Sequence, residues 1–381
     1  MMLVPRAPPR TDPRLDTWFM DMAITVSRRM MGRTWPNPSV GAVLVRFDAD
    51  GPVVVGRGWT APGGRPHAET EALRRAGEAA NGATLYVTLE PCSHHGHTPP
   101  CADAVVAAGV RRVVVAVDDP NPLVAGAGYA RLRDAGIAVE RGVGAVEAGR
   151  ILAGHLRRMR EKRPQVLLKL AVSADEKIGL PNRRPVAITG PEVQVRVHLM
   201  RAASDAVLVG VGTALADDPL LTCRLPGMAN RSPVRVILDT HLRLPLTSRL
   251  VESIATAPVW VVAGPDAAAD REAALRDRGV QVFRSPAASG LLDLGAALEL
   301  LAGKGLTRLM VEGGSILAAR LAQADLVDEF AVSRAPKVIG PDGVDALEGV
   351  PLSTFTASPR FVSRGIEALG VDTLEVFDRV G

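Results

Sequence analysis

Two short segments determine the interpretation of this chain: HAE at residues 67–69 and EPCSHHGHTPPC at residues 90–101. Between them they supply one imidazole, on His67, and two thiols, on Cys92 and Cys101. Three such ligands suit tetrahedral zinc, with the fourth position left for a water molecule that becomes a nucleophile near neutral pH. The sequence therefore predicts a catalytic zinc site.

Glu69 lies two residues after His67, which is too close in sequence for a convenient fourth ligand but well placed for proton transfer. His-x-Glu followed by Pro-Cys and a later Cys is the signature of zinc-dependent nucleobase deaminases. The alternative is that His67 packs in a core and the cysteines are buried thiols. Cysteine is scarce, however, and two of the 3 cysteines lie in this segment. We therefore expect Glu69 to be the catalytic acid–base group.

The segment between the two thiols is longer than in the common form of this motif, Cys-x-x-Cys. It carries three histidines, which leaves open whether one of them replaces a cysteine as ligand: His94, His95 and His97. Because three ligands and a water already complete a catalytic tetrahedron, we expect none of the three to bind the metal.

The string PCSHHGHTPPC at residues 91–101 resembles the long form of the motif in the bifunctional riboflavin-biosynthesis deaminase/reductase family. The resemblance covers nearly the whole chain after the first fifteen residues or so. It implies an α/β protein with an N-terminal cytidine-deaminase-like αβα domain and a C-terminal dihydrofolate-reductase-like α/β domain. It also implies two activities, a zinc-dependent deamination of a pyrimidine that carries a ribose phosphate and an NADPH-dependent reduction of that ribose to a ribityl chain.

Length and composition agree with a two-domain enzyme. A chain of 381 residues is long enough for two or three domains. Because 47% of its residues are hydrophobic, each domain can have a sizeable core. No apolar run approaches the ~20 residues that span a bilayer. Residues 1–15 lack the apolar segment of a secretory signal peptide, and we interpret them as a disordered leader. Sparse cysteines without a disulfide framework indicate a reducing, cytoplasmic location.

The charge gives little support to nucleic-acid binding. Lys+Arg 45 against Asp+Glu 41 is a modest excess, with a net charge of +4. The dense basic cluster at residues 157–163 is expected to be a helix end and linker, so we predict domains at 16–160 and 161–381. We expect a small-molecule substrate and neither a nucleic acid nor a membrane as partner, and leave a homo-oligomer open.

The first half alternates between helical and strand patterns, which predicts a mixed or parallel sheet with helices on its faces. A helix is expected from Asp16 to a C-cap at Gly32, and another over residues 68–79. Asn37 stands between two prolines in a rigid turn. This asparagine either faces solvent or, as the resemblance implies, contacts the pyrimidine.

The second half begins with a strand at residues 166–175, in which Lys169 interrupts an apolar run. Lysine is rarely buried without a partner, so the residue either snorkels from an edge strand or, as the resemblance implies, faces the active cleft. A strand at 308–311 runs into Glu312-Gly313-Gly314 and a helix. This connection is either an ordinary strand–turn–helix or a phosphate-binding site made by free backbone N–H groups at the start of the helix. The resemblance favours the phosphate-binding site.

The resemblance also implies roles for individual residues in the two sites. The residues expected to bind substrate are Asn37, Lys169, Arg201, Leu221, Arg224 and Glu312. The residues expected to bind NADPH are Ala171, Thr213, Asp217, Thr240, Gly314, Ser315, Ile316, Leu317, Ala318, Ala319 and Arg320. The chain departs from the usual family residue at Thr60, Glu71, Glu176, Pro185 and Ala187. The role of His97, where some relatives have Arg or Lys, stays open.

A second hypothesis is a nucleic-acid or nucleoside deaminase whose C-terminal half is a binding module. The shared zinc motif and the mild basicity favour it. The long insert, an aromatic content of 3% and phosphate-loop signals in the second half oppose it.

Overall fold

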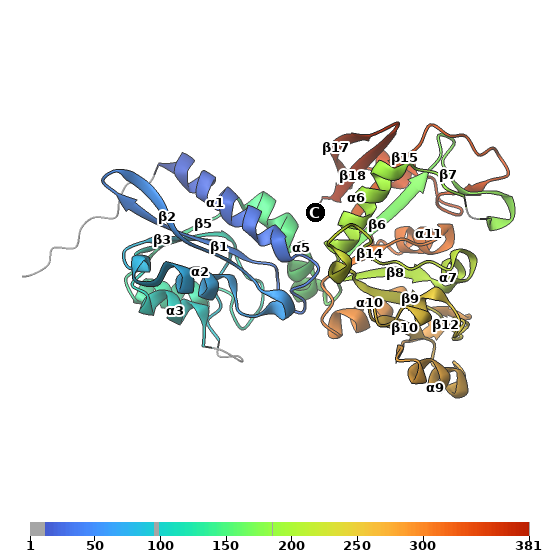
Figure 1. The fold of residues 1–381 in the computed structure, drawn as a ribbon, viewed down its shortest axis with the longest axis horizontal. Coiled ribbons are helices and arrows are strands. Elements are labelled where there is room, and N and C mark those ends of the chain that lie inside the picture. The colour runs from blue at the N-terminus through green and yellow to red at the C-terminus, as the bar shows by residue number, and fades with distance from the viewer. Residues whose placement is uncertain (1–11, 95–98, 185, 381) are drawn as a thin grey trace, which may run out of the picture. The chain divides into compact units, whose positions relative to one another are not determined.

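The computed structural model describes residues 12–94, 99–184 and 186–380, apart from the side chain of Asn182. The chain separates into two compact units, residues 1–161 and residues 162–381, each with its own sheet (Figure 1). The division falls inside the basic segment 157–163. No helix of the described residues is long and apolar enough to cross a membrane.

The first unit alternates helices and strands along the chain except at the antiparallel pair β1 and β2. Its elements are α1 (Pro13–Ser27), β1 (Gly41–Asp48), β2 (Gly51–Trp59), α2 (Ala68–Ala76), β3 (Thr84–Leu89), α3 (Cys101–Ala107), β4 (Arg112–Val117), α4 (Ala127–Asp134), β5 (Ala138–Arg141) and α5 (Ala145–Glu161).

The five strands of this unit form a mixed sheet in the order β2-β1-β3-β4-β5. Strand β1 is antiparallel to β2 and β3, whereas β3, β4 and β5 are parallel, so of the two predicted possibilities, mixed or parallel, the sheet is mixed. Helices α1 and α5 cover one face, and α2, α3 and α4 cover the other. Buried residues on the two faces include Phe19, Met20, Val43 and Ala148 on the first and Ala72, Leu85, Val105 and Leu132 on the second.

The N-terminal helix differs from its prediction at both ends. It begins at Pro13, because Asp12 caps it by accepting a hydrogen bond from the N–H of Arg14. The last three residues of the predicted leader are therefore helical, and residues 1–11 lie outside the described part. The α-helix ends at Ser27, and a 3₁₀ turn continues to the left-handed Gly32 (φ +76°).

Two glycines on β2 set the distance between this strand and helix α2. A methyl group at Gly58 would lie within 3.0 Å of the carbonyl oxygen of Ala68, and one at Gly56 within 3.0 Å of that of Ala72. The strand and the helix therefore pack backbone against backbone. This contact positions the N-terminus of α2, which directly follows His67.

The second unit is larger. Its elements are β6 (Gln165–Val172), β7 (Lys177–Gly179), α6 (Pro191–Ala202), β8 (Ala206–Gly210), α7 (Val211–Asp217), β9 (Val234–Leu238), α8 (Arg249–Glu252), β10 (Val259–Ala263), α9 (Ala269–Asp277), β11 (Gln281–Arg284), β12 (Ala287–Ala288), β13 (Leu291–Leu292), α10 (Leu294–Gly303), β14 (Arg308–Val311), α11 (Ser315–Gln323), β15 (Glu329–Arg334), β16 (Val344–Asp345), α12 (Ser353–Thr356), β17 (Phe361–Leu369) and β18 (Asp372–Arg379).

Its main sheet has nine strands in the order β11-β10-β9-β8-β14-β6-β15-β18-β17. All are parallel except the last two, β18 and β17, which are antiparallel to their neighbours. Strand β6, which carries Lys169, lies between β14 and β15. The edge-strand interpretation of this lysine is therefore wrong. Because parallel strands end at the same edge, Gly210, Leu238 and Val311 bring their following loops together there.

We expect Gly58→Ala to loosen the contact between β2 and α2. Overpacking typically costs about 1–3 kcal/mol, and here the displaced atoms are backbone. Thermal unfolding followed by circular dichroism should show a lower midpoint, with less zinc in the purified protein.

Gly149→Ala is the matched control, because Gly149 lies inside α5 with open space around its Cα. Alanine there should leave zinc content unchanged and raise stability by up to about 1 kcal/mol. Equal zinc content in wild type and Gly58→Ala would contradict the proposed dependence of the site on this packing.

Candidate functional site

The structure brings the three expected zinc ligands together in the first unit. His67 is the N-cap of α2, Cys92 follows β3 and Cys101 is the first residue of α3. The His67 Nδ1 atom lies 3.3 Å from Cys101 Sγ and 3.7 Å from Cys92 Sγ. Among the described residues this is the one group of His, Cys, Asp or Glu side chains that could hold a metal, and His94 is not part of it. His95 and His97 lie outside the described residues.

The two thiols shift each other's pKa in opposite directions. The hydrogen bond from the Cys101 thiol, together with those from His67 and the Cys101 N–H, lowers the pKa of Cys92 to about 4. The pKa of Cys101 is raised, first by its bond to Cys92 and then by burial. One nitrogen and two sulfur donors, each within 4.8 Å of the others, form a donor set that suits zinc. Binding of the metal requires both thiols to be deprotonated.

Glu69 lies in the first turn of α2 and is 4% exposed. Burial raises the pKa of this carboxyl to about 7, and the nearby His67 opposes the shift. A carboxyl group with a pKa near neutrality can both accept and donate a proton under working conditions. Glu69 therefore lies in the same turn of chain as His67 with a pKa that suits acid–base chemistry.

Asn37 has a structural partner in this unit. Its side-chain amide donates a hydrogen bond to the Gly64 carbonyl oxygen (2.9 Å), which joins its turn to the loop leading to His67. Thr60 accepts a hydrogen bond from the N–H of Val40, and Glu71 pairs with arginines on its own helix. Both departures from the family pattern therefore have local structural roles.

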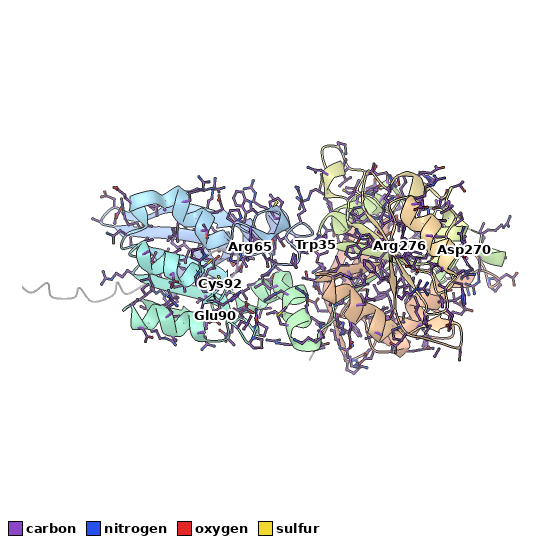
Figure 2. All side chains as sticks on the ribbon, turned by 90° about the horizontal axis from the view of Figure 1, so that it is seen from below. Trp35, Arg65, Glu90, Cys92, Asp270 and Arg276 are labelled. Carbon is purple, nitrogen blue, oxygen red and sulfur yellow. The ribbon has the colours of Figure 1, made fainter. Side chains whose placement is uncertain are left out.

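Sequence reasoning missed Glu90, which directly precedes Pro91-Cys92 (Figure 2). Its carboxylate is 3% exposed and accepts hydrogen bonds from the N–H groups of Gly126 and Gly128, both at 3.2 Å. These bonds fix the chain just before Cys92 to the N-terminus of α4. The only available signal was an acidic residue beside the motif, and its partners lie 36 and 38 positions away.

In the second unit, three cations and one carboxylate meet near the end of β14. Arg201 donates two hydrogen bonds to Glu312, at 2.6 and 2.8 Å. Burial alone would raise the pKa of Glu312, but the charge of Arg201 and these bonds hold it below its usual value. Burial lowers the pKa of Lys169, and the charge of Glu312 opposes that shift. Arg224 is the third cation, with its pKa lowered by burial and by Arg201.

His198 is a second residue that sequence reasoning missed. It is buried on α6, and its Nδ1 lies 3.1 Å from the Thr222 carbonyl oxygen, which also accepts from Arg201. The segment between Leu221 and Arg224 is thereby fixed to α6. Leu221 itself is buried in a left-handed conformation (φ +54°), and no direct role in binding is visible for it.

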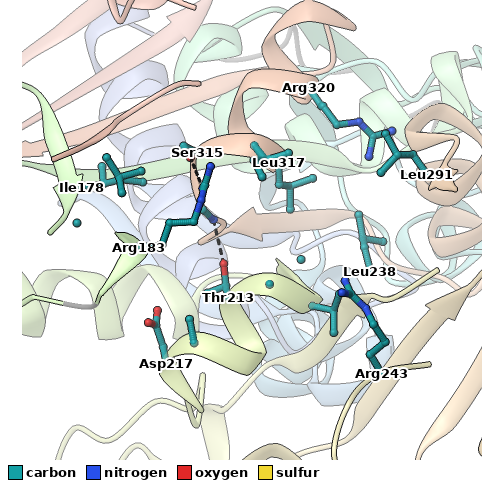
Figure 3. Close-up of a pocket in the computed structure, with 18 of the residues that line it drawn as sticks. Ile178, Arg183, Thr213, Asp217, Leu238, Arg243, Leu291, Ser315, Leu317 and Arg320 are labelled. Carbon is teal, nitrogen blue, oxygen red and sulfur yellow. Dashed lines mark hydrogen bonds between the residues drawn. The ribbon is translucent and has the colours of Figure 1, made fainter. Parts of the chain in front are cut away.

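A cavity of about 440 Å³ lies at the carboxyl ends of β8, β9 and β14 (Figure 3). The expected cofactor residues that line it are Thr213, Asp217, Thr240, Gly314, Ser315, Ile316, Leu317 and Arg320. Those that do not line it are Ala171, Ala318 and Ala319; the last two are buried inside α11. The sequence did not single out the lining residues Arg183, Arg184, His241 and Arg243.

The comparisons with known proteins cover both units. The family described as cytidine and deoxycytidylate deaminase zinc-binding region matches residues 13–117. The family described as RibD C-terminal domain matches residues 164–374. The riboflavin biosynthesis protein RibD of Escherichia coli K12 is 40% identical over 370 residues, covering 94% of this chain and 97% of that protein. RibD of Aquifex aeolicus is 36% identical over 365 residues, which cover 96% of this chain and 99% of that protein.

Two solved structures are similar over 97% of this chain. Acinetobacter baumannii RibD has a TM-score of 0.85 at 36% identity, with 100% of that chain covered. A Thermotoga maritima diaminohydroxyphosphoribosylaminopyrimidine deaminase/5-amino-6-(5-phosphoribosylamino)uracil reductase has a TM-score of 0.82 at 33% identity, with 99% covered. The fold class expected from the sequence is confirmed. The chain belongs to the RibD family of riboflavin-biosynthesis proteins, which combine a zinc-binding deaminase domain and an NADPH-dependent reductase domain.

Proposed function

We propose that the first unit deaminates a diaminohydroxy-phosphoribosylaminopyrimidine and that the second reduces the ribosyl chain of the product to ribityl with NADPH. The observation that carries this proposal is the presence of two complete sets of groups in two units of one chain. One set is the zinc-type cluster with Glu69, and the other is the cavity of the second unit together with the Arg201–Glu312 pair.

In the deaminase centre, we assign the metal to His67, Cys92 and Cys101. Zinc bound there supplies a water whose pKa is lowered to about 7. Glu69 would accept a proton from the attacking water and donate it to the departing amine, and overall water and the amino-pyrimidine would become the oxo-pyrimidine and ammonia. We assign pyrimidine binding to Asn37, whose turn is joined by a hydrogen bond to the loop that leads to His67.

In the reductase centre, we assign substrate binding to Lys169, Arg201, Arg224 and Glu312. NADPH supplies the hydride that is transferred to C1 of the ribosyl chain. The arginines offer planar donor forks to the substrate phosphate, and Glu312 keeps Arg201 in position. The residues from Gly314 to Leu317 and Arg320 line the cavity where the cofactor binds.

The proposal needs neither a nucleic acid nor a membrane as partner, and a homo-oligomer is compatible with it. The three cysteines form no disulfide, which supports a cytoplasmic enzyme. The alternative of a nucleic-acid deaminase with an accessory binding domain is not favoured, because the second unit matches the RibD C-terminal domain along nearly its whole length.

Cys92→Ala should remove most of the bound zinc, because the remaining His67 and Cys101 leave a site of two ligands. Metal analysis of the purified protein measures this directly. Cys223→Ala is the matched control, since Cys223 is a buried cysteine of the other unit and should not change zinc content. Full zinc occupancy of Cys92→Ala would contradict the ligand assignment.

Glu69→Gln should abolish ammonia release while leaving the reductase active. General acid–base groups typically contribute about 10²–10⁴-fold to rate, so the loss should be plain in an ammonia assay. The same variant should oxidise NADPH at the wild-type rate when it is given the deaminated ribosylamine substrate. Loss of this second activity in a folded, zinc-loaded variant would rule out two separate sites.

Arg224→Ala should have the opposite effect. Hydrogen bonds to charged groups contribute about 1.5–3 kcal/mol, so KM for the deaminated substrate should rise about 10- to 100-fold, with ammonia release unchanged. Arg224→Lys should recover part of the loss, because it keeps the charge without the planar fork. An unchanged KM in Arg224→Ala would exclude Arg224 from the substrate site.

A further inference from the structure

Three side chains form a connected group beside the cavity of the second unit: Arg183, Ser315 and Glu348. Arg183 Nη2 donates to Glu348 Oε2 (2.6 Å), and Arg183 Nη1 donates to Ser315 Oγ (3.3 Å). The Ser315 hydroxyl donates to the same Glu348 oxygen (3.2 Å). Arg183 and Ser315 line the cavity, as Figure 3 shows with the dashed contact between them.

The three residues come from three separate segments. Ser315 opens helix α11, Arg183 ends the turn after β7, and Glu348 follows β16. The side chains of Arg183 and Glu348 are 54% and 50% exposed, so neither is a core residue whose loss would unfold the unit. The ion pair with Arg183 also lowers the pKa of Glu348, so this carboxylate is charged at neutral pH.

The position of this carboxylate matters because the cofactor contains a dianionic pyrophosphate bridge. A phosphate oxygen is recognised by guanidinium and hydroxyl donors, which are the donors that Glu348 uses here. Glu348 and a cofactor phosphate would therefore compete for the same two partners. A charged carboxylate left beside the pyrophosphate would also repel it.

We propose that Glu348 takes the place of a cofactor phosphate oxygen in the NADPH-free protein. Arg183 and Ser315 exchange Glu348 for the pyrophosphate when NADPH binds. This inference rests on the proposed use of the cavity for NADPH and goes beyond it, because it names two residues, Arg183 and Glu348, that set cofactor affinity in opposite directions.

The test is equilibrium binding of NADPH to the full-length, zinc-loaded protein without pyrimidine substrate, followed by the change in NADPH fluorescence. Exposed ion pairs are weak, so Glu348→Gln, which keeps the shape and removes the charge, should bind NADPH about two- to fivefold more tightly. Arg183→Met should bind it about tenfold more weakly, since it removes a charged donor.

The chain offers a matched control in the ion pair between Lys177 Nζ and Asp345 Oδ1 (2.6 Å). It joins β7 to β16, the strands that precede Arg183 and Glu348, but neither of its residues lines the cavity. Asp345→Asn should therefore leave NADPH binding unchanged. If it tightened binding as much as Glu348→Gln, the effect would come from loosening these segments and the proposal would be overturned.

Equal or weaker binding by Glu348→Gln, or unchanged binding by Arg183→Met, would also overturn the exchange. These results differ from a failure of the proposed function. A wild-type protein that does not bind NADPH at all would contradict both the reductase assignment and this inference. If the wild-type protein binds NADPH but Glu348→Gln does not bind it more tightly, or Arg183→Met does not bind it more weakly, only this inference is contradicted.

Discussion

The deaminase centre depends on the close packing of helix α2 against strand β2. At Gly56 and Gly58 the strand meets the carbonyl oxygens of α2 with no side chain between them. A backbone contact of this kind has little freedom to adjust, unlike one made through long side chains. It fixes the start of α2, and with it the imidazole at the N-cap and Glu69 two residues later in the first turn. Metal ligands tolerate only a few tenths of an ångström of error, so the site needs this rigidity.

The reductase centre depends instead on a balance of charge. Lys169, Arg201 and Arg224 are cations grouped around a single carboxylate, Glu312. Burying a charge without a partner is costly, and Glu312 compensates Arg201 through two short hydrogen bonds. One carboxylate cannot neutralise three cations. The excess positive charge favours an anionic substrate, which agrees with a pyrimidine that carries a phosphate.

The sequence predicted the parts of both sites that consist of neighbouring residues or of strong motifs. The apolar runs gave the central strands, and the spacing of His and Cys gave the metal cluster. It could not show that Lys169 lies on a central strand, because a single run of residues contains no information on strand order. Glu90, His198 and Arg183 were missed for a related reason. Their partners lie 24 to 165 positions away, so only the folded chain brings them together.

The departures from the family pattern show how this chain accommodates unusual residues. Glu176 stands where the resemblance expects glycine, and it adopts a left-handed conformation (φ +59°) that costs a residue with a Cβ roughly 1–2 kcal/mol. Its exposed ion pair with Arg334 offsets at most about 1 kcal/mol. The backbone also holds the turn, through bonds from the Glu176 N–H to Ser173 and from the Ala346 N–H to Glu176. This turn joins β6, which carries Lys169, to β7, which lines the cavity, so its backbone bonds connect two strands that contribute to the reductase site.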